Sequence, residues 1–163
     1  MISLKLKNTR KFMSHLLLLD TFDRFFFIKG EVQTCITVDI DGYMQKEFFD
    51  PEDVYHVEEY ARWERVRPFV FSLIKGKHTP LGLRLIFCLS PEDTARLIRQ
   101  NDLDFQAENV QGLYLNLRFD GSSLQCITGT SLKTFVIDKS LEHAWDKAVQ
   151  KFLAKKEIDF EEL

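Results

Sequence analysis

Two stretches of this sequence begin with Val-Gln and end with Asp-Gly, and they constrain the fold more than any other feature. The first is VQTCITVDIDG, residues 32–42, and the second is VQGLYLNLRFDG, residues 110–121. Each stretch has alternating or nearly alternating apolar residues up to an Asp-Gly pair, which is typical of a strand that enters a hairpin turn. The recurrence predicts a chain built from two copies of one unit.

Other landmarks recur around these stretches in the same order. A strand pattern at residues 2–6 precedes a helix start at Asn8-Thr9, and a strand pattern at residues 83–89 precedes a helix start at Ser90-Pro91. A later helix carries a tryptophan in each half, Trp63 in the first and Trp145 in the second. Few identities match between the halves, so the alternative is a coincidence of common residue pairs.

These landmarks predict an α+β fold, with tandem β-α-β-β-α pseudo-repeats forming one antiparallel sheet with helices on one face. We expect a single domain over residues 1–163, with pseudo-repeats at residues 1–80 and 81–158 related by a pseudo-two-fold axis. Residues 159–163 are expected to form a charged, frayed tail. The segment LKTFVI, residues 132–137, is an additional strand candidate in the second half.

Turn lengths predict which side chains share a face of the sheet. A two-residue turn at Asp120-Gly121 would pair Leu117 with Leu124 and Leu115 with Cys126 on the buried face. In the first copy, a three-residue loop at residues 40–42 pairs Ile36 and Val38 with Met44 and Phe48. The opposite face then carries Thr37, Asp39, Gln45 and Glu47 in the first copy, and Tyr114, Asn116, Arg118, Ser123, Gln125 and Ile127 in the second.

Composition narrows the classes of function. The chain has fifteen Phe among 163 residues, so we expect an aromatic core. The formal net charge is −3 and neither half is basic, which disfavours nucleic-acid binding. Three widely spaced cysteines in apolar runs indicate buried thiols in a reducing compartment. The short leucine run near the N-terminus is no signal peptide, and no stretch is long enough to span a bilayer, so we expect a cytoplasmic protein without a membrane partner.

No pattern in the sequence specifies catalytic, cofactor-binding or metal-binding residues, and we expect none of these sites. The segment GTSLKT, residues 129–134, lacks the Gly-Lys-Ser/Thr of a phosphate loop, although Thr130 and Lys133 remain candidates for an anion or ligand contact. Four scattered histidines lack zinc-site spacing, and His143 with Asp146 is interpreted as a solvated surface pair. The acids between residues 50 and 59 are interpreted as helix-start residues.

A basic patch is a further candidate site, and much of it has a structural explanation. Lys75 and Lys77 suit the C-terminal end of a helix that stops at Gly76, while Pro68 is expected to kink or restart that helix. The candidate basic residues are Arg62, Arg65, Arg67, Lys75 and Lys77. The candidate ligand- or partner-binding residues are Tyr114, Asn116, Arg118, Gln125, Thr130 and Lys133.

Two resemblances accompany these patterns. A pair of β-α-β-β-α units of about 80 residues resembles the layout of the TATA-binding protein saddle, which implies an open sheet face with Tyr114, Asn116, Arg118 and Gln125 as its reading surface. Asp39 and Glu47 on the equivalent face depart from that family, because carboxylates repel phosphate. The second resemblance is in the amino-acid sequence itself, where three segments are similar to a family of uncharacterised clostridial (Firmicute) proteins, a domain of unknown function. These segments are TGTSLKTFVIDKSLEHAWD, FDRFFFIKGEV and RPFVFSLIKGKHTPL.

Three hypotheses for function follow. The first is a non-enzymatic binding or scaffold module that presents its open sheet face, or a sheet edge, to a protein partner or to its own copy. The second is a nucleic-acid-binding domain that uses the saddle face and the basic patch. The third is a small-ligand binder or enzyme that uses Thr130, Ser131 and Lys133. The sequence favours the first, and it leaves enzymatic activity uncertain.

Overall fold

The computed structural model describes residues 1–163, with four α-helices and seven strands in one antiparallel sheet. The helices are α1 (Thr9–Leu17), α2 (Trp63–Ile74), α3 (Pro91–Gln100) and α4 (Ser140–Lys155). The strands are β1 (Ser3–Leu6), β2 (Phe26–Gln33), β3 (Thr37–Asp41), β4 (Gly82–Cys88), β5 (Val110–Phe119), β6 (Leu124–Leu132) and β7 (Phe160–Glu162). Along the sheet they lie in the order β3-β2-β4-β5-β6-β1-β7.

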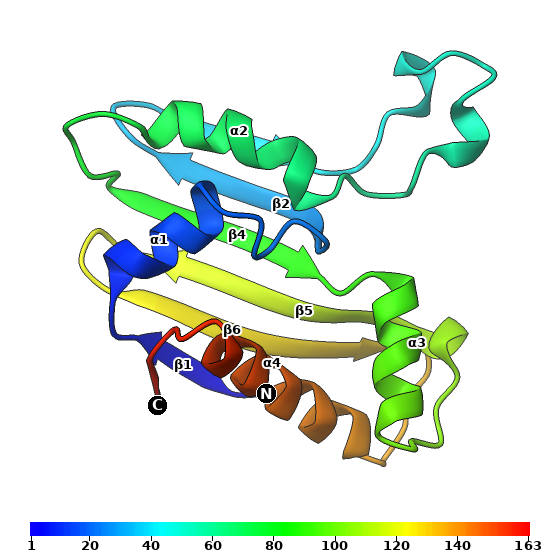
Figure 1. Ribbon diagram of the computed structural model, residues 1–163. Coiled ribbons are helices and arrows are strands. Elements are labelled where there is room, and N and C mark those ends of the chain that lie inside the picture. The colour runs from blue at the N-terminus through cyan, green and yellow to red at the C-terminus, as the bar shows by residue number, and fades with distance from the viewer.

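All four helices lie on the same side of the sheet (Figure 1). The alternation of side chains along each strand explains the arrangement. In β4, Leu83, Leu85 and Phe87 are buried beneath the helices, while Arg84 and Ile86 point to the other side. The predicted α+β fold, with one antiparallel sheet and helices on one face, is therefore confirmed. We call the side without helices the open face.

Local signals placed the helix starts correctly. Asn8 caps α1 by accepting a hydrogen bond from the backbone N–H of Lys11, and Ser90 caps α3 by accepting one from Asp93. Helix α2 runs through Pro68 without a break, so the helix does not restart there, and the alternative expectation of a kink stays a prediction. Helix α1 ends at Leu17, and Leu19 beyond its end is exposed.

The first hairpin differs from its prediction. Strand β2 pairs with β3 through a turn at residues 34–36, so the stretch 32–42 contains a turn in its middle and is not one strand. Thr34 stabilises the turn, because its backbone N–H and its hydroxyl both donate to the carbonyl of Ile36. The expected loop at residues 40–42 is wrong, and Gln45 and Glu47 lie outside the sheet.

The second hairpin has the predicted faces but a different register. Phe119 pairs with Leu124 and Leu117 with Cys126, two residues away from the predicted pairing. The connection has four residues, because the carboxylate of Asp120 accepts hydrogen bonds from the backbone N–H groups of Ser122 and Ser123. A shift of two residues keeps every side chain on its face, so the predicted buried and open faces of β5 and β6 hold.

The order β-α-β-β-α occurs twice along the chain, but the sheet does not relate the two units by a two-fold axis. Strand β4 lies beside β5, whereas its counterpart β1 pairs with β6 and not with β2. In addition, residues 32–42 cross a hairpin while residues 110–119 form one strand. The pseudo-two-fold arrangement was therefore wrong, and an ancestral duplication stays a prediction.

Two expectations about the second half were also wrong. Residues 159–163 are no frayed tail, because β7 pairs with β1 and Ile158 is buried beside it. The segment 132–137 forms no strand beyond Leu132, and Phe135 is 93% exposed in the loop that follows. The seventh strand is therefore formed by residues 160–162 and not by residues 132–137.

The histidine of α1 gives the fold a pH dependence. Burial lowers the pKa of His15 below its usual 6.5, and the positive charges of Lys11 and Lys156 lower it further. The unfolded chain therefore binds the proton more readily, so stability is expected to fall as the pH drops through about 6.5. Urea unfolding at pH 7.5 and 5.5 measures this loss, and His15→Gln should remove part of it. An equal loss in the variant would assign it to other groups.

Candidate functional site

The open face carries one row of mostly charged side chains that crosses the whole sheet. Residues that pair directly across antiparallel strands share a face, so the row can be followed from the pairings alone. We call it the charged row. In the order of the strands β3 to β7 it consists of Asp39, Glu31, Arg84, Arg118, Gln125, Lys5 and Glu161.

The row contains both like and opposite charges on neighbouring strands, with Glu31 opposite Arg84 and Lys5 opposite Glu161. Asp39 and Glu31 are neighbours at one end, and Arg84 lies directly opposite Arg118 in the middle. No member of the row forms a salt bridge. Like charges directly opposite each other destabilise a sheet, so the Arg84–Arg118 pair costs stability in the isolated chain, and Glu31 on the other side of Arg84 offsets part of that cost. A hollow of about 390 Å³ lies on this part of the face, lined by Asp39, Glu31, Arg84, Arg118, Lys29 and Asn116 among others.

Four of the predicted contact residues lie together on this face. Tyr114, Asn116 and Arg118 alternate along β5, and Gln125 lies opposite Arg118 on β6. The side-chain amide of Asn116 donates a hydrogen bond to the carbonyl of Ile127, which fixes its orientation. The ring of Tyr114 lies over Gly112, where a Cβ atom would come within 2.5 Å of it. Partial burial raises the pKa of the Tyr114 hydroxyl.

The other two predicted residues do not join this group. Thr130 lies opposite the buried Leu113 and therefore faces the helices, where its hydroxyl is buried without a hydrogen-bond partner. Lys133 is exposed in the loop after β6. Both line a separate hollow of about 300 Å³ beside Leu141 of α4. The structure thus divides the predicted residues between two places.

The basic residues of the second candidate site are dispersed. Arg62 binds the carboxylate of Glu58 through two nitrogens, at 2.7 and 2.8 Å, and these bonds raise its pKa. Arg67 binds Asp23 in the same two-pronged way. Arg65 lies over the ring of Phe49 at the start of α2, whereas Lys75 and Lys77 follow the end of that helix. No continuous basic patch results.

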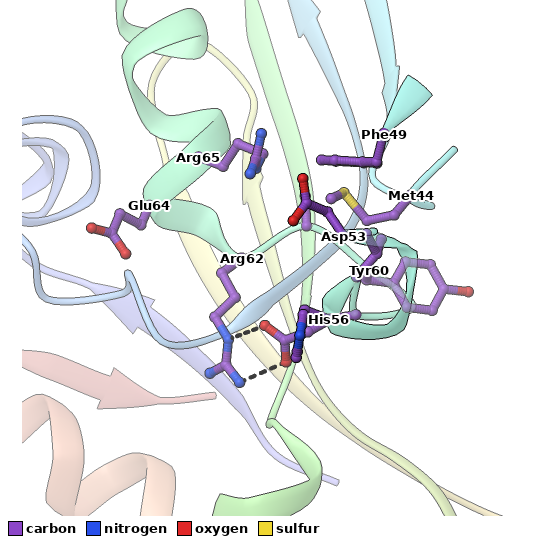
Figure 2. A pocket seen from close by; sticks show the side chains of 11 residues that line it. Met44, Phe49, Asp53, His56, Tyr60, Arg62, Glu64 and Arg65 are labelled. Carbon is purple, nitrogen blue, oxygen red and sulfur yellow. Dashed lines mark hydrogen bonds and ion pairs between the residues drawn. The ribbon is translucent and has the colours of Figure 1, made fainter. Parts of the chain in front are cut away.

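A pocket of about 530 Å³ lies between the start of α2 and the long excursion that connects β3 to α2 (Figure 2). The Arg62 to Glu58 ion pair lies on one side of it, Met44 and Tyr60 lie on another, and Asp53 lies between them. The acids of the excursion begin no α-helix, and Asp53 precedes the short 3-10 helix Val54–His56 without a side-chain cap hydrogen bond. His56 also lines this pocket.

Sequence reasoning missed a buried carboxylate on α4. Asp146 was interpreted as a solvated partner of His143, but it is buried and accepts a hydrogen bond from the hydroxyl of Thr128 on β6. The contact ties α4 to the sheet, and the ammonium group of Met1, 3.1 Å from the other carboxylate oxygen, compensates the buried charge. The signal was its helical spacing, because Asp146 lies three residues before the buried Val149 and seven before the buried Leu153.

One of the three cysteines is accessible, contrary to the expectation that all are buried. Cys35 is exposed in the β2–β3 turn, while burial raises the pKa of Cys88 to about 11 and also raises that of Cys126. We expect a maleimide or disulfide reagent to label one thiol in the folded protein and all three in denaturant. Mass spectrometry of Cys35→Ser should then show no fast-reacting thiol. Rapid labelling of that variant would contradict this account.

Two further structural findings concern metal binding and membrane spans. No group of three or more His, Cys, Asp and Glu side chains is placed to hold a metal ion. None of the four helices combines the length and the apolar character needed to cross a bilayer.

Comparison with known proteins identifies a family but brings no activity with it. Residues 15–161 match a family described as a family of unknown function (DUF5721). No curated protein and no solved structure matches the chain, so the likeness to the TATA-binding protein and the clostridial source stay predictions. Because the match runs from the end of α1 into β7 and so covers most of the chain, the chain belongs to this family of unknown function.

Proposed function

We propose that this protein is a non-enzymatic binding module that receives a protein partner on the open face of its sheet. The observation that carries the proposal is the charged row, in which Arg84 and Arg118 lie directly opposite each other and neither forms a salt bridge. Buried interfaces use such charges to select a partner and fix its register. A partner with acidic groups above the two arginines would remove the repulsion.

The charge of the face favours a protein over a nucleic acid. Asp39, Glu31 and Asp41 occupy its β3 and β2 end, and carboxylates there repel a phosphate backbone that follows the sheet. We place this activity in the cytoplasm, where free thiols such as the buried Cys88 and Cys126 stay reduced.

Site-specific photo-crosslinking in living cells tests the proposal. A photoreactive residue at position 118 should give a discrete protein adduct, and the adduct should disappear when Arg84 is changed to Glu. The matched control is position 99, since Arg99 is an exposed arginine on α3, away from the open face. Absence of any adduct from position 118, or equal adducts from positions 118 and 99, would refute the proposal.

A further inference from the structure

We infer that the partner is a second copy of this chain, seated face to face on the open sheet about a two-fold axis. This inference rests on the proposed function and names its partner. The axis runs parallel to the strands and passes between β2 and β4. It places β3 of one copy over β5 of the other, and β2 over β4.

Charge complementarity argues for this axis. An axis parallel to the strands keeps the position along each strand, so the charged row of one copy lies over the same row of the other. Asp39 then faces Arg118 of the second copy, and Glu31 faces Arg84. Two-fold symmetry repeats both contacts, so all four charges of each copy meet an opposite charge. The repulsion between Arg84 and Arg118 is relieved at the same time.

Other positions of the axis fail on the same row. An axis through β4 places Arg84 over Arg84 of the second copy, and an axis through β5 places Arg118 over Arg118 of the second copy. An axis between β4 and β5 places Arg84 over Arg118. Each of these overlays brings two guanidinium groups together across the interface and places no carboxylate of the other copy over either of them. The position between β2 and β4 pairs every charge of the four strands and leaves no like charges in contact.

The adjacent row of open-face residues, two positions further along each of the four strands, is also compatible with this axis. It contains Asp41, Lys29, Ile86 and Asn116 on β3, β2, β4 and β5. The same axis places Asp41 over Asn116, whose amide keeps one N–H free beyond its bond to Ile127. It places Lys29 over Ile86, so that the aliphatic stem of the lysine can cover an apolar side chain.

The sheet edges do not offer an equivalent contact. Strand β3 is one edge, and antiparallel pairing with its own copy would bring Asp39 and Asp41 against the same acids. The other edge, β7, consists of Phe160, Glu161 and Glu162 and meets the same obstacle. Charges on edge strands are a common protection against such pairing. The open face is therefore the surface that a second copy can cover.

The overlap sets the expected strength of the dimer. Four strands spaced about 4.8 Å apart and about 17 Å long form a small contact, which belongs to the weak class of protein interfaces. A small interface held by charge pairs should dissociate as salt increases. Self-association is therefore expected to depend strongly on ionic strength.

Sedimentation equilibrium of the purified full chain tests the inference with two charge-swap variants. Arg84→Glu/Arg118→Glu makes the row acidic over these four strands, and Glu31→Lys/Asp39→Lys makes it basic. Each variant alone should self-associate more than about tenfold more weakly than the wild type, because every contact becomes like-charged. Mixed in equal amounts they should form a heterodimer, since each acidic row then faces a basic one.

The control carries the same charge change elsewhere. Arg99→Glu/Lys147→Glu alters two exposed cations on α3 and α4 and should dimerise like the wild type. Circular dichroism confirms that each variant is folded, and recovery in the mixture excludes misfolding as the cause of the loss. A wild-type monomer at every concentration and salt, or a mixture that stays monomeric, would overturn the inference. In that case an adduct at position 118 to a different protein would still support the proposed function.

Discussion

Gly42→Ala is expected to destabilise the protein by at least about 3 kcal/mol, the upper end of the range for overpacking. A Cβ atom at this position would lie 1.8 Å from the carbonyl oxygen of Phe27. Phe27 belongs to β2, which lies between β3 and β4, so this carbonyl is fixed in the sheet. The backbone of Gly42 is also bound on both sides, since its N–H donates to Ile28 and its carbonyl accepts from Ala61. Neither the segment at Gly42 nor strand β2 can move away without breaking these hydrogen bonds.

Urea unfolding followed by circular dichroism measures the effect. Gly129→Ala is the matched control, because its Cβ would meet the nearest atom at 3.7 Å, an ordinary contact, and the change should stay within about 1 kcal/mol. If Gly42→Ala proved as stable as Gly129→Ala, the close approach of the excursion to β2 would be wrong, and so would the pocket that it forms.

Trp63→Ala should lower the free energy of unfolding by about 3–5 kcal/mol. Trp63 is fully buried at the start of α2, with its ring 5.0 Å from that of Phe87 and 5.5 Å from that of Phe27. Its indole N–H also donates to the carbonyl of Leu16, at 2.8 Å. That carbonyl belongs to the last turn of α1, where it lacks an intrahelical partner, so Trp63 joins the two helices.

Two further variants separate packing from the hydrogen bond. Trp63→Phe keeps a buried ring but leaves the Leu16 carbonyl unsatisfied, which costs about 1–3 kcal/mol. Phe69→Ala removes an exposed ring from the same helix and should change stability little. Equal losses for Trp63→Ala and Phe69→Ala in urea unfolding would show that Trp63 is not the centre of the aromatic core.

Local signals made part of this fold predictable from the sequence. The alternation in Ile2 to Leu6 and the caps Asn8 and Ser90 depend on neighbouring residues alone, and the structure confirms β1, α1 and α3 there. The polar side of β5 was predictable for the same reason, because alternation fixes the face of Tyr114, Asn116 and Arg118.

Features that depend on distant contacts were not predictable. The turn at Thr34–Ile36 lacks glycine and asparagine, so the nearby Asp41-Gly42 pair drew the hairpin to the wrong place. The charged row depends on which residue of β2 lies opposite Arg84, and an irregularity between Phe27 and Lys29 sets that register. Such an irregularity leaves no simple pattern in the sequence.

Crosslinking between cysteines on two copies tests the central claim most directly. In a Cys35→Ser background, one preparation carries Asp39→Cys and a second, of different size, carries Arg118→Cys. A short bismaleimide should join the two proteins when they are mixed at low salt and should join neither protein to itself, because the proposed axis places each cysteine over the other kind. Mixed dimers that form only in the mixture are the predicted result. Failure to form them, or equal dimers from each protein alone, would contradict the account.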